Sequence, residues 1–123
     1  SLGNAGANKD PYEWVLVRDH AEFSPRYAHA AIVTSQQKMF VLGGAVADLS
    51  ADGQGGYLQD VWRSDNNGKD WSEVLPRSPK FSARRGHAAV MDVDRVVMFV
   101  LGGFCGRSCF NNDWWNSENG DVW

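Results

Sequence analysis

The sequence repeats itself once, and this internal repeat constrains the fold more than any other feature. Three blocks recur in the same order: 23–31 at 81–89, 39–44 at 98–103, and 60–64 at 113–117. Six of nine positions are identical in the first block, and the second block, Met-Phe-Val-Leu-Gly-Gly, recurs unchanged. Because a period of 53 to 59 residues suits one supersecondary unit, the chain is expected to contain two similar units.

The repeated blocks are expected to be β-strands. They are rich in Val, Phe, Trp and small residues, and Gly, Asn, Asp or Pro separate them, which is typical of strands joined by turns. No stretch has an amphipathic helical period of useful length. The strands expected in the first unit are 28–34, 38–44, 58–64 and 70–75, with matching strands in the second.

Four antiparallel strands in each period predict a β-propeller blade. The blocks also resemble the kelch motif: Arg-x-x-His, an apolar strand ending in Gly-Gly, and Asp-Val-Trp followed nine residues later by Trp71. The resemblance covers the chain from Trp14 onward and points to the superfamily of the galactose oxidase central domain. It implies an all-β propeller fragment of about two four-stranded antiparallel kelch-type blades.

The resemblance also divides the chain into three parts. Residues 1–22 are expected to hold the end of a preceding blade, with an outer strand near 13–17, and a linker. Residues 23–80 are expected to form the first blade. Residues 81–123 are expected to form an incomplete second blade whose outer strand is cut.

The segment 64–71, Ser-Asp-Asn-Asn-Gly-Lys-Asp-Trp, resembles an Asp-box, a hairpin found in sialidases and many secreted propellers, with Asn66 in place of the usual Asp. Side chains such as Ser64 and Asn66 hydrogen-bond nearby backbone N–H groups, and Gly68 supplies a left-handed residue. We therefore expect this turn to have a structural role.

Most other repeated residues are also expected to be structural. Glycines at a strand end tolerate positive φ and close backbone approach, and indole rings fill the space between packed sheets. His29 and His87 occupy equivalent positions, whereas an active site needs a residue once, with unlike partners. The residues expected to be structural are Gly43, Gly44, Gly102, Gly103, Trp62, Trp71, Trp115, Trp123, His29 and His87. No residue is expected to be catalytic.

Two loops depart from the repeat, and the first resembles half of a calcium loop. It runs Asp-Leu-Ser-Ala-Asp-Gly over 48–53, with oxygen side chains at alternate positions. Its twelfth position is Gln59, where a bidentate Glu would be needed, and no helix is expected beside it. We therefore expect no metal and no other cofactor, and keep Asp48 and Asp52 as binding candidates.

The second loop carries Cys105 and Cys109, the only two cysteines. Tetrahedral zinc would need two more Cys or His nearby, so a loop-closing disulfide is favoured, with two reduced thiols as the alternative. A disulfide would indicate an oxidising compartment. The location is otherwise undetermined, and a disulfide favours an extracellular or secretory one.

Composition excludes two classes of partner. The chain has 12 basic and 15 acidic residues and no basic cluster longer than Arg84 and Arg85, which argues against nucleic-acid binding. The longest apolar run, 96–101, is too short to cross a bilayer. A hydrophobic content of 43% is enough for a packed core.

These observations favour a binding scaffold. In a four-stranded meander, the loop between the second and third strands and the segment between units emerge on the same face, where binding usually occurs. The candidate binding residues are Arg26, Tyr27, Arg84 and Arg85, together with Asp48 and Asp52. The expected partner is a protein or peptide, with carbohydrate as a further class, beside the remaining blades in the same chain or in oligomer copies.

Two alternatives remain. The chain could belong to a galactose-oxidase-like or sialidase-like propeller enzyme. A galactose-oxidase-like enzyme needs a Tyr, Cys and His constellation, and a sialidase needs an arginine triad with Tyr and Glu. Two units supply only part of either. It could also be a two-blade lectin whose copies close one ring.

Overall fold

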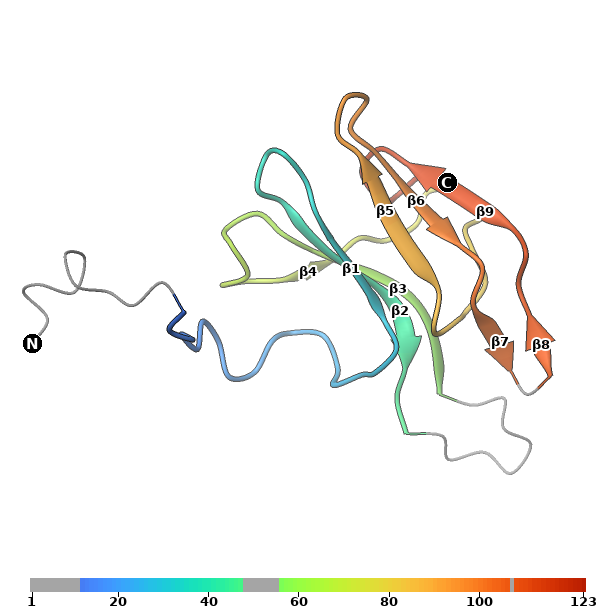
Figure 1. Ribbon diagram of the computed structural model, residues 1–123, viewed down its shortest axis with the longest axis horizontal. Helices are drawn as coiled ribbons and strands as arrows, with labels where there is room; N and C mark the ends of the chain where they lie inside the picture. Colours follow the sequence, from blue (N-terminus) through green and yellow to red (C-terminus); the bar gives the residue numbers. More distant parts are fainter. Residues whose placement is uncertain (1–11, 48–55, 107) are drawn as a thin grey trace, which may run out of the picture.

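The computed structural model describes residues 12–47, 56–106 and 108–123, which form antiparallel strands without a helix (Figure 1). The all-β prediction is therefore confirmed. The strands are β1 (Ala30–Val33), β2 (Met39–Ala45), β3 (Tyr57–Ser64), β4 (Ser72–Glu73), β5 (Ala88–Asp92), β6 (Val97–Leu101), β7 (Phe104–Gly106), β8 (Cys109–Phe110) and β9 (Trp114–Ser117). Over this part of the chain there is consequently no helix able to span a membrane.

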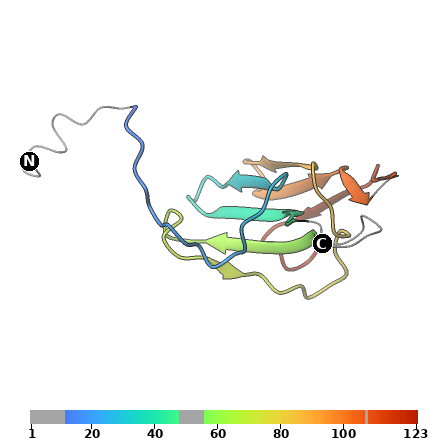
Figure 2. The same ribbon diagram turned by 90° about the horizontal axis from the view of Figure 1, so that it is seen from below.

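The strands form two main sheets and one hairpin. The first sheet has the order β1-β2-β3-β4, and Figure 2 shows β4 at its edge. The second sheet has the order β5-β6-β9, and β7 pairs with β8 in a short hairpin inserted between β6 and β9. The first sheet is thus the expected four-stranded meander, whereas the second has three strands.

The two repeats have the same strand register. Ala30 lies opposite Leu42 in the first sheet, and Ala88 lies opposite Leu101 in the second. On the next pair of strands, Trp62 and Trp115 lie opposite the equivalent valines of β2 and β6. The sequence repeat is therefore also a repeat of backbone pairing.

Three expected strands differ from those observed. The first begins at Ala30, because Ala28 has a positive φ of 54°. The fourth is reduced to Ser72–Glu73. Residues 13–17, where an outer strand is expected to pair with a preceding blade, are not in a strand in the described part of the chain, and Trp14 is almost fully exposed.

The glycine pair occupies a bulge in the first repeat, which corrects the expectation that it ends the strand. β2 continues to Ala45, and its register with β3 shifts between Leu42 and Gly44. A Cβ on Gly44 would lie 2.7 Å from the His29 Cβ, so the chains can approach this closely only at glycine. In the second repeat, β6 ends before Gly102 as expected.

One hydrophobic core joins the two sheets. Buried side chains of the first sheet pack against buried side chains of the second repeat: Ile32, Phe40, Leu42 and Val61 on one side, and Phe81, Met98 and Val100 on the other. Trp115 and Trp123 are partly buried against this core. Trp62 and Trp71 lie elsewhere, beside Phe23. The core is therefore an interface between repeats.

Candidate binding surface

Each repeat contains a bidentate ion pair between its Arg-x-x-His block and its third strand segment. Arg84 donates to both carboxylate oxygens of Asp113 at 2.8 and 3.1 Å and to the Gly102 carbonyl at 2.9 Å. In the first repeat, Arg26 makes the same bonds to Asp60 at 2.7 and 2.9 Å. Both guanidinium groups are shielded from solvent, with side-chain exposures of 0% and 1%. This planar fork is the strongest geometry for an arginine–carboxylate pair.

These two pairs change the assignment of Arg26 and Arg84, which the sequence placed among the binding candidates. Their donors are used inside each repeat, where they hold the segment before the first strand against the third. Hydrogen bonds from Arg84, and then from Trp115, lower the pKa of Asp113 to about 2. Burial alone would raise the pKa of Asp60, but hydrogen bonds from Arg26 and Trp62 outweigh it and lower that pKa. We therefore treat both arginines as structural.

Arg85 lies at the centre of a group of aromatic rings contributed by both repeats. Its guanidinium carbon is 5.5 Å from the ring centroids of Tyr57 and Phe104 and 5.7 Å from that of Tyr27. Its Nε donates to the Tyr57 hydroxyl at 3.1 Å. Cation–π attraction operates at these distances. The arrangement therefore fixes three rings around one positive charge.

The β7–β8 hairpin supplies the outer part of this group. Phe104 and Phe110 meet edge to face with centroids 5.2 Å apart, and Phe110 is 73% exposed. Cys105 and Cys109 form a disulfide across the hairpin, with Cα atoms 5.2 Å apart. Arg85 and Phe104 also exchange backbone hydrogen bonds of 3.0 and 2.8 Å. The hairpin is thus attached to the inter-repeat segment both by backbone hydrogen bonds and by the contact between the Arg85 guanidinium and the Phe104 ring.

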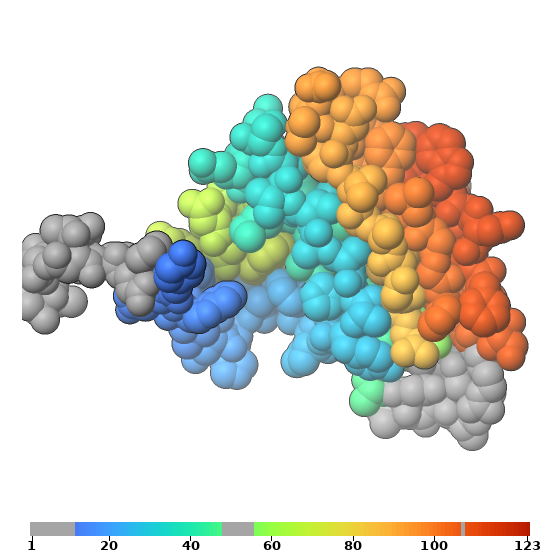
Figure 3. All heavy atoms as spheres, viewed as in Figure 1, coloured from blue at the N-terminus to red at the C-terminus, as the bar shows by residue number. Residues whose placement is uncertain are grey.

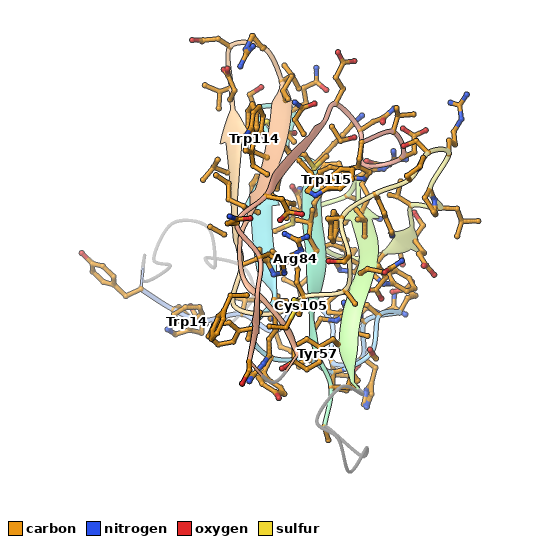
Figure 4. The ribbon with its side chains drawn as sticks, turned by 90° about the vertical axis from the view of Figure 1, so that its right-hand side faces the viewer. Trp14, Tyr57, Arg84, Cys105, Trp114 and Trp115 are labelled. Carbon is orange, nitrogen blue, oxygen red and sulfur yellow. A yellow bond between two sulfur atoms is a disulfide. The ribbon has the colours of Figure 1, made fainter. Side chains whose placement is uncertain are left out.

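We name this group the aromatic–arginine cluster: Tyr27, Tyr57, Arg85, Phe104 and Phe110. Tyr57 and Cys105 lie toward one end of the molecule and Trp114 toward the other (Figure 4). Exposed rings and an arginine on a rigid base are typical of interaction surfaces. The sequence predicted Tyr27 and Arg85, and it missed Tyr57, Phe104 and Phe110. Asp48 and Asp52 lie outside the described residues.

The two histidines have structural surroundings. His87 is buried, and its Nε2 lies 2.9 Å from the Leu42 carbonyl oxygen, to which it must donate because a carbonyl only accepts. Its Nδ1 has no hydrogen-bond partner, and burial lowers its pKa. His29 is exposed, and its pKa is lowered by partial desolvation and then by Arg26. Arg84 and His29 lie close enough to the His87 imidazole to lower its pKa further.

The polar turn at 64–71 is built from side chain to backbone bonds. The Ser64 hydroxyl accepts the Gly68 N–H at 2.9 Å, and the Asn66 amide oxygen accepts the Asp70 N–H at 2.9 Å. The indole of Trp71 donates to the Gly68 carbonyl at 3.0 Å. Asn66 thus supplies the acceptor that an Asp would supply, and these bonds give the turn a structural role.

No protein-family model matches this chain, and no curated protein matches it either. Over the residues that the structure describes, no group of three His, Cys, Asp or Glu side chains is arranged to hold a metal ion. The fold and the site together define an all-β protein with an internal repeat and an exposed aromatic–arginine cluster.

Proposed function

We propose that this chain is a pair of kelch-type β-propeller blades and that its aromatic–arginine cluster binds a partner protein or peptide. The blade assignment rests on the kelch-like blocks, the four-stranded meander of the first sheet, and the register shared by both repeats. It also rests on the packing of one sheet against the next through a shared core.

The cluster geometry carries the binding proposal. The exposed rings of Tyr27 and Phe104 flank a guanidinium that is held by Tyr57, and the exposed Phe110 packs on Phe104, so a partner would meet a preformed surface. Interfaces take most of their binding energy from a few aromatic and arginine side chains of this kind. Because the rings are already fixed, little conformational entropy is lost on binding.

Selection from a displayed random-peptide library, followed by affinity measurement on the purified chain, tests this function. We expect enriched peptides to bind the chain and to lose about tenfold or more in affinity when Phe110 is changed to Ala, since truncation of an interface anchor costs about 1–2 kcal/mol or more. Tyr27→Ala should have a similar effect.

Leu75→Ala is the matched control, because Leu75 is equally exposed but lies outside the cluster. Its affinity for the peptides should equal that of the unchanged chain. Peptides that bind Phe110→Ala and Tyr27→Ala undiminished would place the binding surface elsewhere. Binding only to a glycan array, abolished by the same substitutions, would replace the protein-partner proposal with the lectin alternative.

A further inference from the structure

The two sheets differ in how far their equivalent side chains are exposed, and the shared register identifies which residues are equivalent. Inward-facing residues of the first sheet are buried by the second repeat, whereas their counterparts in the second sheet face outward. The equivalent pairs are Ile32 and Val90, Phe40 and Phe99, Leu42 and Leu101, and Val61 and Trp114. Leu42 and Val61 are 0% exposed, but Leu101 is 40% and Trp114 is 62% exposed.

We name these outward residues of the second sheet, Val90, Phe99, Leu101 and Trp114, the tail face. The second sheet bounds the right-hand side of the molecule in Figure 3, and Figure 4 looks onto that side, where Trp114 is labelled. Its apolar side chains occupy positions that are buried in the first repeat. The tail face therefore repeats the apolar surface on which the second repeat already packs.

The matching half of the interface is the Arg-x-x-His segment. In the second repeat, this segment docks on the first repeat through four hydrogen bonds of 2.8 to 2.9 Å. They are Arg84 N–H to Leu58 O, Gly44 N–H to Arg84 O, Gly86 N–H to Ala28 O, and His87 Nε2 to Leu42 O.

The first repeat presents the same segment without a neighbour. The groups equivalent to the docking groups are Arg26 N–H and C=O, Ala28 N–H and His29 Nε2. Within the described residues, none has the partner that its counterpart has. Phe23, equivalent to the fully buried Phe81, is partly exposed, and Val33, equivalent to the partly buried Met91, is exposed. We name Phe23, Arg26, Ala28, His29 and Val33 the head face.

We propose that two copies of this chain associate head to tail, with the head face of one copy docked on the tail face of the other. The contact reproduces the interface between the two repeats, so His29 Nε2 would donate to the partner copy's Leu101 carbonyl. The head and tail faces are different surfaces, so the contact is heterologous and can continue into a ring or a linear assembly.

The apolar segment at 13–17 fits the same arrangement. Trp14 precedes Trp71 by 57 residues, so this segment stands before the first repeat where β4 stands before the second. Its side chains Trp14, Leu16 and Val17 are exposed. In the head-to-tail contact it would lie along the partner copy's β9, whose far edge pairs with no described strand.

Sedimentation velocity on single and mixed variants tests the proposal. The unchanged chain should show a mass that rises with concentration above the 13.6 kDa of one copy. Leu101→Glu removes the tail face and Val33→Glu removes the head face, and each replaces an exposed side chain, so the folded monomer should persist. Each variant alone should be monomeric.

An equimolar mixture of the two variants provides the decisive arm. Each variant retains one intact face, so the mixture should form a one-to-one dimer that grows no further. Leu75→Glu, an exposed substitution outside both faces, should assemble as the unchanged chain does. The proposal is overturned if the unchanged chain stays monomeric up to millimolar concentration, if either variant alone still dimerises, or if the mixture remains monomeric. Circular dichroism of each variant verifies its fold.

Discussion

The first and second repeats share a strand register and a shielded arginine–aspartate ion pair, yet equivalent residues lie in different environments. Leu42 is fully buried, whereas its counterpart Leu101 is partly exposed, and the buried His87 corresponds to the exposed His29. Each repeat sets its own backbone through local bonds, but burial comes from its neighbour. The comparison therefore separates interactions made within one repeat from those that need two.

Substitution of the Arg–Asp pair tests the interactions that are made within one repeat. Changing Arg84 to Ala removes its charge-assisted hydrogen bonds to Asp113 and should cost about 2–3 kcal/mol in the free energy of unfolding, since the partly exposed Asp113 carboxylate can be solvated by water. Arg26→Ala should cost nearly as much, because the bonds to Asp60 are equivalent. Chemical denaturation measures both.

Arg77→Ala is the control for this pair, because Arg77 is exposed and its ion pair to Asp121 is long at 3.4 Å. It should change stability by about 0–1 kcal/mol. A cost for Arg26→Ala as small as that for Arg77→Ala would mean that the ion pair depends on the neighbouring repeat, and the comparison would fail.

Substitution of equivalent leucines tests the burial that needs both repeats. Leu42→Ala should destabilise the chain by about 2–5 kcal/mol, because it opens a cavity in the core between the sheets. Leu101→Ala should cost less than about 1 kcal/mol in dilute solution, because its side chain is already partly solvated. Equal costs in thermal and chemical denaturation would contradict the position of the core.

Equivalent glycines give a smaller difference. Gly43 and Gly102 have similar φ angles of 60° and 63°, so alanine would strain both backbones alike. A Cβ on Gly43 would also lie 3.0 Å from the His87 ring and 3.1 Å from the Arg84 carbonyl, whereas one on Gly102 would have its nearest contact at 3.4 Å. We expect Gly43→Ala to cost about 1 kcal/mol more than Gly102→Ala, and identical denaturation midpoints would argue against this packing.

The smallest expected effect is the pH dependence of the inter-repeat contact. Burial lowers the pKa of His87 in the folded chain, so the unfolded chain binds the proton first. Stability is therefore full above the unfolded-state pKa of about 6.5 and falls as the pH drops below it. Arg84 and His29 face this imidazole, and both lower its pKa further, as burial does.

His87→Gln should remove most of the stability change between neutral and mildly acidic pH, as measured by denaturation midpoints. His29→Gln is the matched control and should remove less of it, because His29 is exposed. A pH dependence that survives His87→Gln unchanged would assign the effect to other groups.

Local patterns predicted the strands because short sequence blocks, such as Leu-Gly-Gly and the turn at 64–71, determine where strands pair and where the chain turns. They did not predict that Arg26 and Arg84 are buried, because each partner carboxylate lies 34 or 29 residues away. The available signal was that Arg-x-x-His and the Asp that opens the third block recur together.

The cluster was predicted only in part for a similar reason. Tyr57, Phe104 and Phe110 lie near the ends of the two loops that depart from the repeat, 45–57 and 104–111, and only the fold brings Tyr57 and Phe104 beside Arg85 and Phe110 against Phe104. The β7–β8 hairpin consists of strands of three and two residues, too short for an alternating pattern to indicate.

Amide hydrogen exchange measured by NMR on the dilute chain tests most directly whether burial comes from the neighbouring repeat. The N–H groups of Arg84 and Gly86 bond to Leu58 and Ala28 across the interface, so they should exchange slowly. The equivalent N–H groups of Arg26 and Ala28 should exchange rapidly. Equal protection of the two pairs, whether high or low, would contradict the account.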